Sequence, residues 1–500
     1  MVFIVSNVFI GKYLVSKLTM QYSVVNLGKT IITPNFRLDA EFYRPFYLES
    51  EQLISSKNND HLGNLISVLT DYHANGSYET LRGNVEILDS PDYALMIRTV
   101  DFERDDFEND VKYISEHAYN FLKKTKILGG EIIINKIGNA GKVYLVPPLD
   151  KKISLGMNQF MIRPRESLNN YFLYVFLICK YGQLLLEQRV TGAVPLSIDK
   201  ESVRSVIVPL LKKDFQEKIH KLVEQYFLFS IQGKNLYSQA EQLLLSELGL
   251  LGWKQKHKLA FVKNFSDTQK AERFDAEYFQ PKYEEIVEAV KKYKGGFDEL
   301  GNLVKIKKSV EPGSEAYQES GVPFVRVSNL SKFEFSDNNQ QFISEELYAE
   351  LKTHQPKKGE ILLSKDATPG IAYYLNEETR KMIVSGGILR LKIDNQQVLP
   401  EYLTLVLNSV IAQKQIERDA GGSIINHWRP DQVKATIIPI LKSDKQKEIS
   451  ELVKKSFDDR KLSKSLLEIA KRGVEMAIEK NEQEAEKWIN SELGKLKIKF

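Results

Sequence analysis

The sequence predicts an α+β protein in which two repeated α/β domains are separated by an antiparallel coiled coil of two long helices, with pseudo-twofold symmetry. Two observations predict this fold class: an internal duplication, and a heptad pattern at the end of each copy. The expected parts are an N-terminal extension (1–21), a first domain (22–211), a first long helix (212–256), a second domain (257–441) and a second long helix (442–494).

The duplication is visible as short segments that return in the same order. Arg37-Leu-Asp-Ala-Glu-Phe is echoed by Arg273-Phe-Asp-Ala-Glu-Tyr, and Gly130-Glu-Ile-Ile-Ile-Asn-Lys136 returns as Gly359-Glu-Ile-Leu-Leu-Ser-Lys365. Further matched pairs are Leu62–Leu65 with Leu300–Leu303, Gln216 with Gln446, and Ser246–Gly249 with Ser491–Gly494. So many landmarks in one order exceed chance, and the two copies should share a fold.

Local patterns predict the elements of each copy. Asp39 and Asp275 each precede Ala-Glu and an aromatic pair, as a helix N-cap would. Short β runs end in turns that contain glycine or proline, and apolar helices follow them. The predicted strands are 132–135, 361–364, 207–211 and 437–441, and the predicted helices are 169–188 and 401–418.

Heptads predict the two long helices. In Asp214–Leu248 apolar residues recur at four-three spacing, which favours a seam for a partner helix. The predicted helix-pairing residues are Ile219, Leu222, Tyr226, Phe229, Leu236 and Leu243 in the first helix, and Leu462, Leu466, Ile469 and Met476 in the second. An antiparallel pair is favoured because a parallel pair would leave the chain a long way to travel between the domains. The second helical region is expected to be the longer one, because Gln446 and Ser491 are further apart than Gln216 and Ser246.

Composition limits the possible functions. The single cysteine, Cys179, excludes an internal disulfide framework and a zinc site of clustered cysteines. The net charge of +4 permits nucleic-acid binding through local patches but does not argue for it. The first nineteen residues are apolar but interrupted by polar residues and lysines, so we expect no membrane span and a soluble, cytoplasmic protein.

No enzyme signature is convincing. The chain has no Walker loop and no Gly-x-Gly-x-x-Gly. A metal-dependent nuclease centre could be assembled only from Asp110, Glu131 and Lys136, and the other copy offers only Glu360 and Lys365. We therefore expect no catalytic residue and no metal site in this chain.

A lysine stands beside a glycine turn in both copies, in Lys136-Ile-Gly-Asn-Ala-Gly-Lys142 and in Lys365-Asp-Ala-Thr-Pro-Gly370. Glycine lets the backbone approach a phosphate, and lysine adds charge. Ordinary turns also use glycine at strand ends, which is the competing interpretation. The predicted nucleic-acid contacts here are Lys136, Asn139, Lys142, Lys365 and Thr368.

A second pair of loops covers 192–200 and 421–429. The later loop contributes four more predicted contacts, whose side chains suit base edges, stacking and phosphates: Asn426, His427, Trp428 and Arg429. The competing interpretation is that Trp428 covers the next helix and Asn426 caps it.

With these features the chain resembles the specificity subunit of Type I restriction–modification systems over about residues 22–494. The resemblance rests on the duplicated Arg-x-Asp-Ala-Glu segment, the Gly-Glu-Ile strand with its lysine and glycine turn, and the junction that carries Gln216 and Gln446. It implies two target recognition domains, each reading one half of a bipartite site in double-stranded DNA. Many family members carry Gly-Thr-x-Gly where this chain has residues 137–141 and 366–370, which weakens the transfer of individual contacts.

The resemblance also implies partners. Two methyltransferase subunits would bind S-adenosylmethionine, restriction/translocase subunits would bind ATP and Mg, and this chain would hold no cofactor. Two alternatives remain open from the sequence: a stand-alone restriction nuclease with unrecognised catalytic residues, and a coiled-coil scaffold that binds only proteins.

Overall fold

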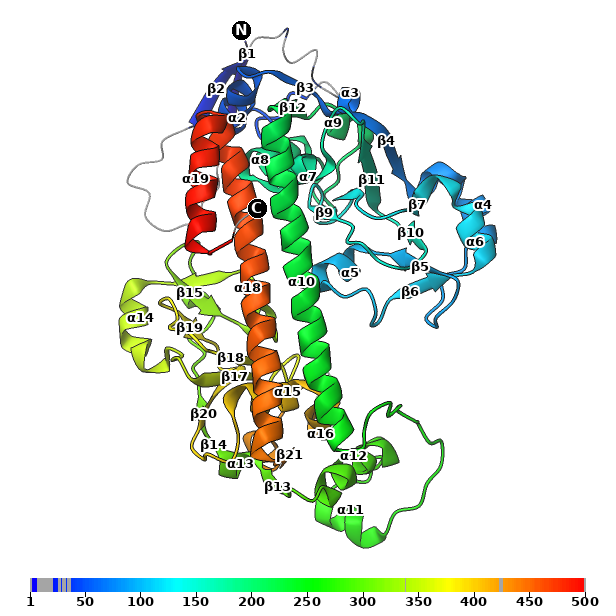
Figure 1. Ribbon diagram of the computed structural model, residues 1–500, viewed down its shortest axis with the longest axis vertical. Helices are drawn as coiled ribbons and strands as arrows, with labels where there is room; N and C mark the ends of the chain where they lie inside the picture. The colour runs from blue at the N-terminus through cyan, green and yellow to red at the C-terminus, as the bar shows by residue number, and fades with distance from the viewer. Residues whose placement is uncertain are drawn as a thin grey trace. The chain divides into compact units, whose positions relative to one another are not determined.

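The computed structural model describes residues 2–6, 21–25, 28, 33, 37–337, 339–421 and 426–498. Most of the predicted N-terminal extension lies outside them, although β1 (Val2–Ser6) pairs antiparallel with β2 (Gln21–Val25). The chain divides into unit 1, Met1–Phe229 with Leu462–Phe500, and unit 2, Ser230–Lys461. The long helices α10 (Lys213–Glu247) and α18 (Ser443–Glu479) each contribute a segment to both units (Figure 1).

Unit 1 is built on an antiparallel sheet of order β4-β11-β8-β9. Its strands are β4 (Ile66–Asp71), β8 (Ile132–Asn135), β9 (Val143–Leu145) and β11 (Gln159–Pro164). Ile132 and Ile134 pack on one face with helix α7 (Asn170–Ile178), whereas Ile133 packs on the other face with the second sheet. Both faces are therefore buried, which explains the unbroken apolar run of β8.

The second sheet of unit 1 has the order β6-β5-β10-β7. It consists of β5 (Ala94–Ile97), β6 (Lys112–Ile114), β7 (Lys126–Ile127) and β10 (Ile153–Leu155). Short helices accompany it: α4 (Tyr78–Asn84), α5 (Thr99–Arg104) and α6 (Glu116–Phe121).

Unit 2 repeats this plan, which confirms the duplication. Its main sheet has the order β14-β20-β17-β18, from β14 (Val304–Lys308), β17 (Glu360–Ser364), β18 (Ala372–Tyr374) and β20 (Ile388–Ile393). A smaller sheet of order β16-β15-β19 covers the other face, from β15 (Val322–Val325), β16 (Gln341–Ile343) and β19 (Ile383–Val384). Helices α11 (Phe265–Ala271), α12 (Pro281–Lys292) and α14 (Glu345–Leu351) complete it. The predicted mixed α/β class is therefore confirmed.

In both units the strand before the long helix has the same surroundings. β12 (Ile207–Pro209) pairs with β3 (Asn59–His61), and β21 (Ile437–Pro439) pairs with β13 (Phe297–Glu299). The repeated Leu-Gly-Asn-Leu segments form α3 (Leu62–Leu65) and α13 (Leu300–Leu303). Their glycines allow close packing on α9 (Lys200–Arg204) and α17 (Pro430–Lys434), because a Cβ at Gly301 would lie 2.9 Å from the Cβ of Lys434.

The repeated glutamine ties each long helix to its domain. Gln216 accepts a hydrogen bond from the Asn169 amide (3.0 Å) and donates to the Leu211 carbonyl (2.8 Å). Gln446 likewise accepts from the Leu399 amide (3.1 Å) and donates to the Leu441 carbonyl (2.9 Å). These backbone groups, which are partly or fully buried, would otherwise lack these partners, and this explains why the glutamine stands at the same place in both copies.

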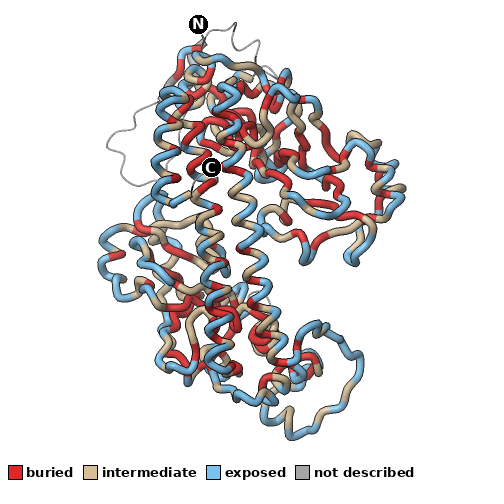
Figure 2. Tube along the Cα trace, viewed as in Figure 1, coloured by how far each residue is buried: buried red, intermediate tan, exposed pale blue. Residues whose placement is uncertain are grey.

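The long helices pair antiparallel within each unit, and this part of the fold prediction is confirmed. In unit 1 the Ser463 hydroxyl donates to the Tyr226 carbonyl (2.8 Å). In unit 2 the Ser456 hydroxyl donates to the Gly233 carbonyl (2.6 Å). The residue numbers of the paired positions therefore increase along α10 and decrease along α18, as in an antiparallel pair. Figure 2 shows buried residues where the two helices meet the domains.

The predicted helix-pairing residues are distributed as follows. Ile219, Leu222, Leu466 and Ile469 are buried in the core of unit 1, and Tyr226, Phe229, Leu462 and Met476 pack half-buried against it. In unit 2 Leu236 and Leu243 are half-buried, and the buried line runs instead through Tyr237 and Leu244. A straight helix drifts by about 20° per heptad relative to a strict seven-residue repeat, so the buried line moves over by one residue.

Three predicted helices were wrong in extent. The second long helix ends at Glu479, and α19 (Glu482–Lys495) follows it because Asn481 caps a new helix through the Glu484 amide (3.0 Å). The helix predicted over 169–188 is α7 and α8 (Lys180–Arg189), and the one over 401–418 is α15 (Pro400–Asn408) and α16 (Val410–Asp419). Cys179 and Ser409 adopt extended backbone at these breaks, and the Ser409 hydroxyl caps α16.

Asp39 and Asp275 accept hydrogen bonds from the amides of Phe42 and Tyr278, both at 3.1 Å. This is the bond of an N-cap, but the segment that follows is a turn, and α2 (Pro45–Ser55) and α12 begin only at the next proline. None of the helices in the part of the chain that the structure describes is long and apolar enough to cross a membrane.

Candidate nucleic-acid interface

In each unit the glycine turn contacts the second predicted loop, 192–200 in unit 1 and 421–429 in unit 2. Backbone bridges connect Ile137 with Ser197 in unit 1, and Asp366 with His427 in unit 2. The carbonyl of Lys136 accepts from the Ile198 amide (3.0 Å), and that of Lys365 accepts from the Trp428 amide (2.8 Å). The predicted contact residues of each copy therefore lie together at one edge of the main sheet, the edge where β8 or β17 ends.

The lysine of the first glycine turn is held by a carboxylate. Lys136 Nζ lies 3.1 Å from Asp71 Oδ2, and Lys200 Nζ lies 2.8 Å from Asp71 Oδ1. Burial raises the pKa of Asp71, but the hydrogen bonds from Lys200 and Lys136 outweigh it and leave the pKa below its usual value. The two lysines and the ionised carboxylate carry one net positive charge at this edge.

The remainder of the first turn is tied to α5. Asn139 Nδ2 and Lys142 Nζ both lie 3.3 Å from Glu103 Oε1, and the Tyr144 hydroxyl donates to the same oxygen at 3.2 Å. Glu103 thus gathers three donors, two of which were predicted contacts. Bonds of 3.3 Å are long for charged groups, so Asn139 and Lys142 can exchange Glu103 for another acceptor at small cost.

The edge of unit 2 carries a different set of groups. Asp366 forms an ion pair with Lys365 and a hydrogen bond with His427, whose Nδ1 lies 2.8 Å from Asp366 Oδ1. The Thr368 amide donates to the Asp366 carbonyl at 2.7 Å. Asn426 and Arg429 are exposed beside them, and Arg429 lies 3.5 Å from Asp431.

The stacking role predicted for Trp428 is wrong. Its side chain is 1% exposed and belongs to the core of unit 2, so no base can reach the ring. The equivalent position in unit 1 is Ile198, also buried, which identifies this as a core position in both copies. The competing interpretation holds for Trp428 but not for Asn426, because Arg429 is the N-cap residue of α17.

The residues considered for a nuclease have structural partners. Glu131 is buried and accepts from Arg163 Nη2 (2.7 Å) and from the amides of Leu128 and Gly129. Glu360 stands at the same place beside Arg390 in unit 2. Among the described residues no group of three or more histidine, cysteine, aspartate or glutamate side chains could hold a metal ion.

An arginine in each unit organises the loop next to this edge, and sequence reasoning missed both. Arg98 Nη2 donates to the Asp110 carbonyl (2.5 Å), and Arg326 Nη2 donates to the Asn339 carbonyl (2.6 Å). Each follows the last residue of a buried strand, Ile97 or Val325. That position was a usable signal, although the segments around it differ most between the copies.

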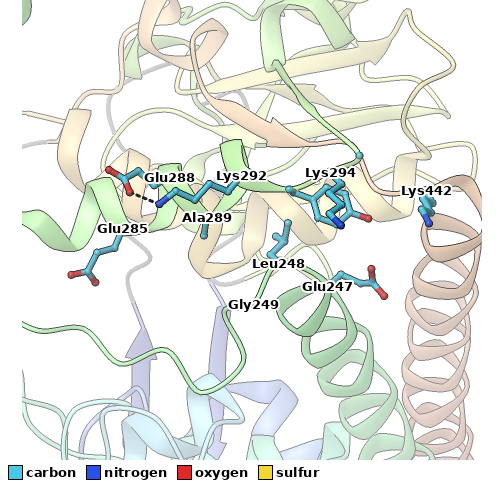
Figure 3. Close-up of a pocket in the computed structure, with 11 residues that line it drawn as sticks. Glu247, Leu248, Gly249, Glu285, Glu288, Ala289, Lys292, Lys294 and Lys442 are labelled. Atoms are coloured by element: carbon cyan, nitrogen blue, oxygen red, sulfur yellow. Dashed lines mark hydrogen bonds and ion pairs between the residues drawn. The ribbon is translucent and has the colours of Figure 1, made fainter.

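Two larger cavities lie in the described structure. A cleft of about 460 Å³ in unit 1 is lined by the glycine turn, α5 and residues 156–158. A cavity of about 740 Å³ in unit 2 lies at the end of α10, where α12 contributes Glu285, Glu288 and Lys292 (Figure 3). The second cavity contains none of the predicted contact residues; its Lys292 pairs with Glu288 at 2.9 Å.

One family model matches part of the chain. Residues 296–470 match the model of the Type I restriction modification DNA specificity domain. Over these residues the chain is therefore similar to the DNA specificity domain of Type I restriction–modification systems. The resemblance drawn from the sequence is confirmed, and the matched specificity domain covers most of the described edge of unit 2 together with the first part of α18.

Solved structures give weaker matches. The S subunit of a Type I system from M. genitalium is 14% identical, with 81% of this chain and 94% of that chain covered and a TM-score of 0.35. The subunit from Thermoanaerobacter tengcongensis is 12% identical, with coverage of 85% and 97% and a TM-score of 0.26. TM-scores this low do not establish a common arrangement of the parts. No curated protein matches the chain.

Proposed function

We propose that this chain is the DNA-specificity subunit of a Type I restriction–modification complex, and that each unit reads one half of a bipartite DNA site. One observation carries the proposal: unit 2 holds a matched specificity domain, and unit 1 repeats its sheet order, loop bridges and glutamine anchor. A duplicated frame with different side chains along its edge suits two readers with different targets.

The long helices suit a spacer between the readers. The 35 residues of α10 correspond to roughly 50 Å at 1.5 Å per residue. Half-sites on one face of B-DNA lie about 34 Å apart per helical turn. The helices thus have the scale needed to span one to one and a half turns of unread DNA.

Catalysis is assigned to partners. Methylating a base requires that it be flipped into an active site, and the specificity domain is a recognition domain. We propose two adenine methyltransferase subunits that bind S-adenosylmethionine, with restriction/translocase subunits that bind ATP and Mg, all acting on DNA in the cytoplasm. The stand-alone nuclease is not supported, since Glu131 and Glu360 are buried and pair with Arg163 and Arg390.

The salt dependence of DNA binding tests the assignment of the loop edges. The DNA-binding constant K falls as salt rises, and Lys142→Ala and Arg429→Ala should each make the slope of log K against log salt less steep by about 0.9, because each removes one phosphate contact. Binding of the assembled complex to duplex DNA, measured by fluorescence anisotropy from 50 to 300 mM salt, checks this.

Lys292→Ala is the matched control, because Lys292 lies on α12 outside both loop edges. It should leave the slope unchanged. Equal slopes for all variants would show that the loops do not contact phosphates, and absence of any DNA affinity in the complex would favour the protein scaffold instead.

A further inference from the structure

The two units carry different residues at equivalent places beside their glycine turns. The amide of Lys136 donates to the Asn158 carbonyl (2.8 Å), and the amide of Lys365 donates to the Gly387 carbonyl (2.9 Å). Gly156 and Ser385 also occupy equivalent places, since each donates its amide to the last residue of the neighbouring strand. Met157 and Asn158 in unit 1 therefore stand where unit 2 has two glycines.

In unit 2 a side chain at Gly387 would require Val327 to shift. A Cβ at Gly387 would lie 2.9 Å from Val327 Cγ2. Unit 1 instead presents two exposed side chains, and Asn158 does so with a φ of +63°. Left-handed backbone is uncommon for any residue except glycine, although asparagine tolerates it best.

The side chains of Met157 and Asn158 line the cleft of about 460 Å³. Its wall also includes Asn139 from the glycine turn and the apolar side chains of Ile87 and Ile137, which are 41% and 37% exposed. The cleft thus presents hydrogen-bonding amide groups beside exposed apolar side chains. They suit the edge of a base pair, which presents both hydrogen-bonding atoms and, in thymine, a methyl group.

The floor of the cleft is rigid. Asn135 Oδ1 accepts from the Thr99 hydroxyl at 2.8 Å, and Gln159, which is buried, contacts the same hydroxyl. Arg98 is fixed by Asp101 at 2.7 Å and by the Asp110 carbonyl. A rigid floor positions the reading side chains without a large entropic cost on binding.

We propose that Asn158, together with Asn139 and Met157, reads base edges of the half-site recognised by unit 1. The asparagine amides bind N6 and N7 of adenine, and Met157 contacts a thymine methyl group. The inference rests on the proposed function and adds the reading residues and their base class: the half-site read by unit 1 contains an A·T pair at the cleft. Unit 2, with glycines at the equivalent place, must read its half-site with other side chains.

Asn158→Gly tests this inference directly. Glycine adopts the left-handed backbone of Asn158 without strain, so the fold should be retained. Asn158→Asp keeps the shape but removes the N–H donor, which provides a second variant. The full chain is produced with its methyltransferase partner, and methylated adenines in the host genome are mapped by single-molecule sequencing.

The expected result is a loss of about tenfold in discrimination at one A·T position of one half-site, with the other half unchanged. Asn120→Ala, an exposed asparagine on α6 outside the cleft, should leave the motif intact. An unchanged motif in both Asn158 variants would overturn the inference while leaving the proposed function standing. A wild-type complex that methylates no defined bipartite motif would overturn both.

Discussion

Replacement of Glu360 by alanine is expected to destabilise unit 2 by about 3–5 kcal/mol, because it leaves a buried guanidinium without its counter-ion. The Arg390 and Glu360 side chains are 3% and 5% exposed, with 3.6 Å between Arg390 Nε and Glu360 Oε2. Arg390 also donates to the carbonyls of Thr353 and Gln355, which cannot balance its charge. The free energy of unfolding in urea measures the loss.

Glu378→Ala is the control for this prediction, since Glu378 is exposed in the loop after β18. Its effect should stay within about 0.5 kcal/mol. Comparing the stability and the DNA cleavage activity of the Glu360→Ala chain also shows whether Glu360 has a structural or a catalytic role. A Glu360→Ala chain of normal stability that had lost a Mg-dependent DNA cleavage activity would favour the stand-alone nuclease.

Ser456→Leu is expected to destabilise the helix pair by about 3 kcal/mol, by overpacking the seam and removing a buried hydrogen bond. Ser456 is fully buried, and its hydroxyl donates to the Gly233 carbonyl at 2.6 Å. The helices meet closely here, as a Cβ at Gly233 would lie 3.0 Å from the Ser456 carbonyl oxygen. A leucine can be accommodated only if the helices separate.

Ser238→Leu provides the matched change on the exposed side of α10. It should shift the urea midpoint little, whereas Ser456→Leu should lower it clearly at unchanged m-value. Equal midpoints for the two variants would contradict a closely packed seam at Ser456.

The elements that were predicted correctly from the sequence are those whose short sequence segments occur in both copies. The glutamine pair, the glycine-turn strands and the strands that enter the long helices all occur twice, so each copy supported the other. Helix breaks were missed because they depend on single caps: Asn481 begins α19, and Ser409 begins α16. The spacing of apolar residues in heptads gives no information about such capping residues.

The candidate site was predicted only in part, for a different reason. Lys136, Asn139 and Lys365 were predicted because a lysine beside a glycine turn is a local signal, and their contact with DNA stays a prediction. Trp428 was misassigned because the sequence could not show that its ring fills the same core position as Ile198. Asn158, which we propose as a reading residue, was not predicted because it meets Asn139 and Ile87 only in three dimensions, in the lining of the cleft.

Exchange of residues 22–211 for the first domain of another family member tests the central claim most directly. The hybrid chain is produced with its methyltransferase partner, and adenine methylation of the host DNA is mapped by single-molecule sequencing. One reader per unit predicts that one half of the methylated sequence changes while the other half is retained. A change in both halves, or in neither, would contradict it.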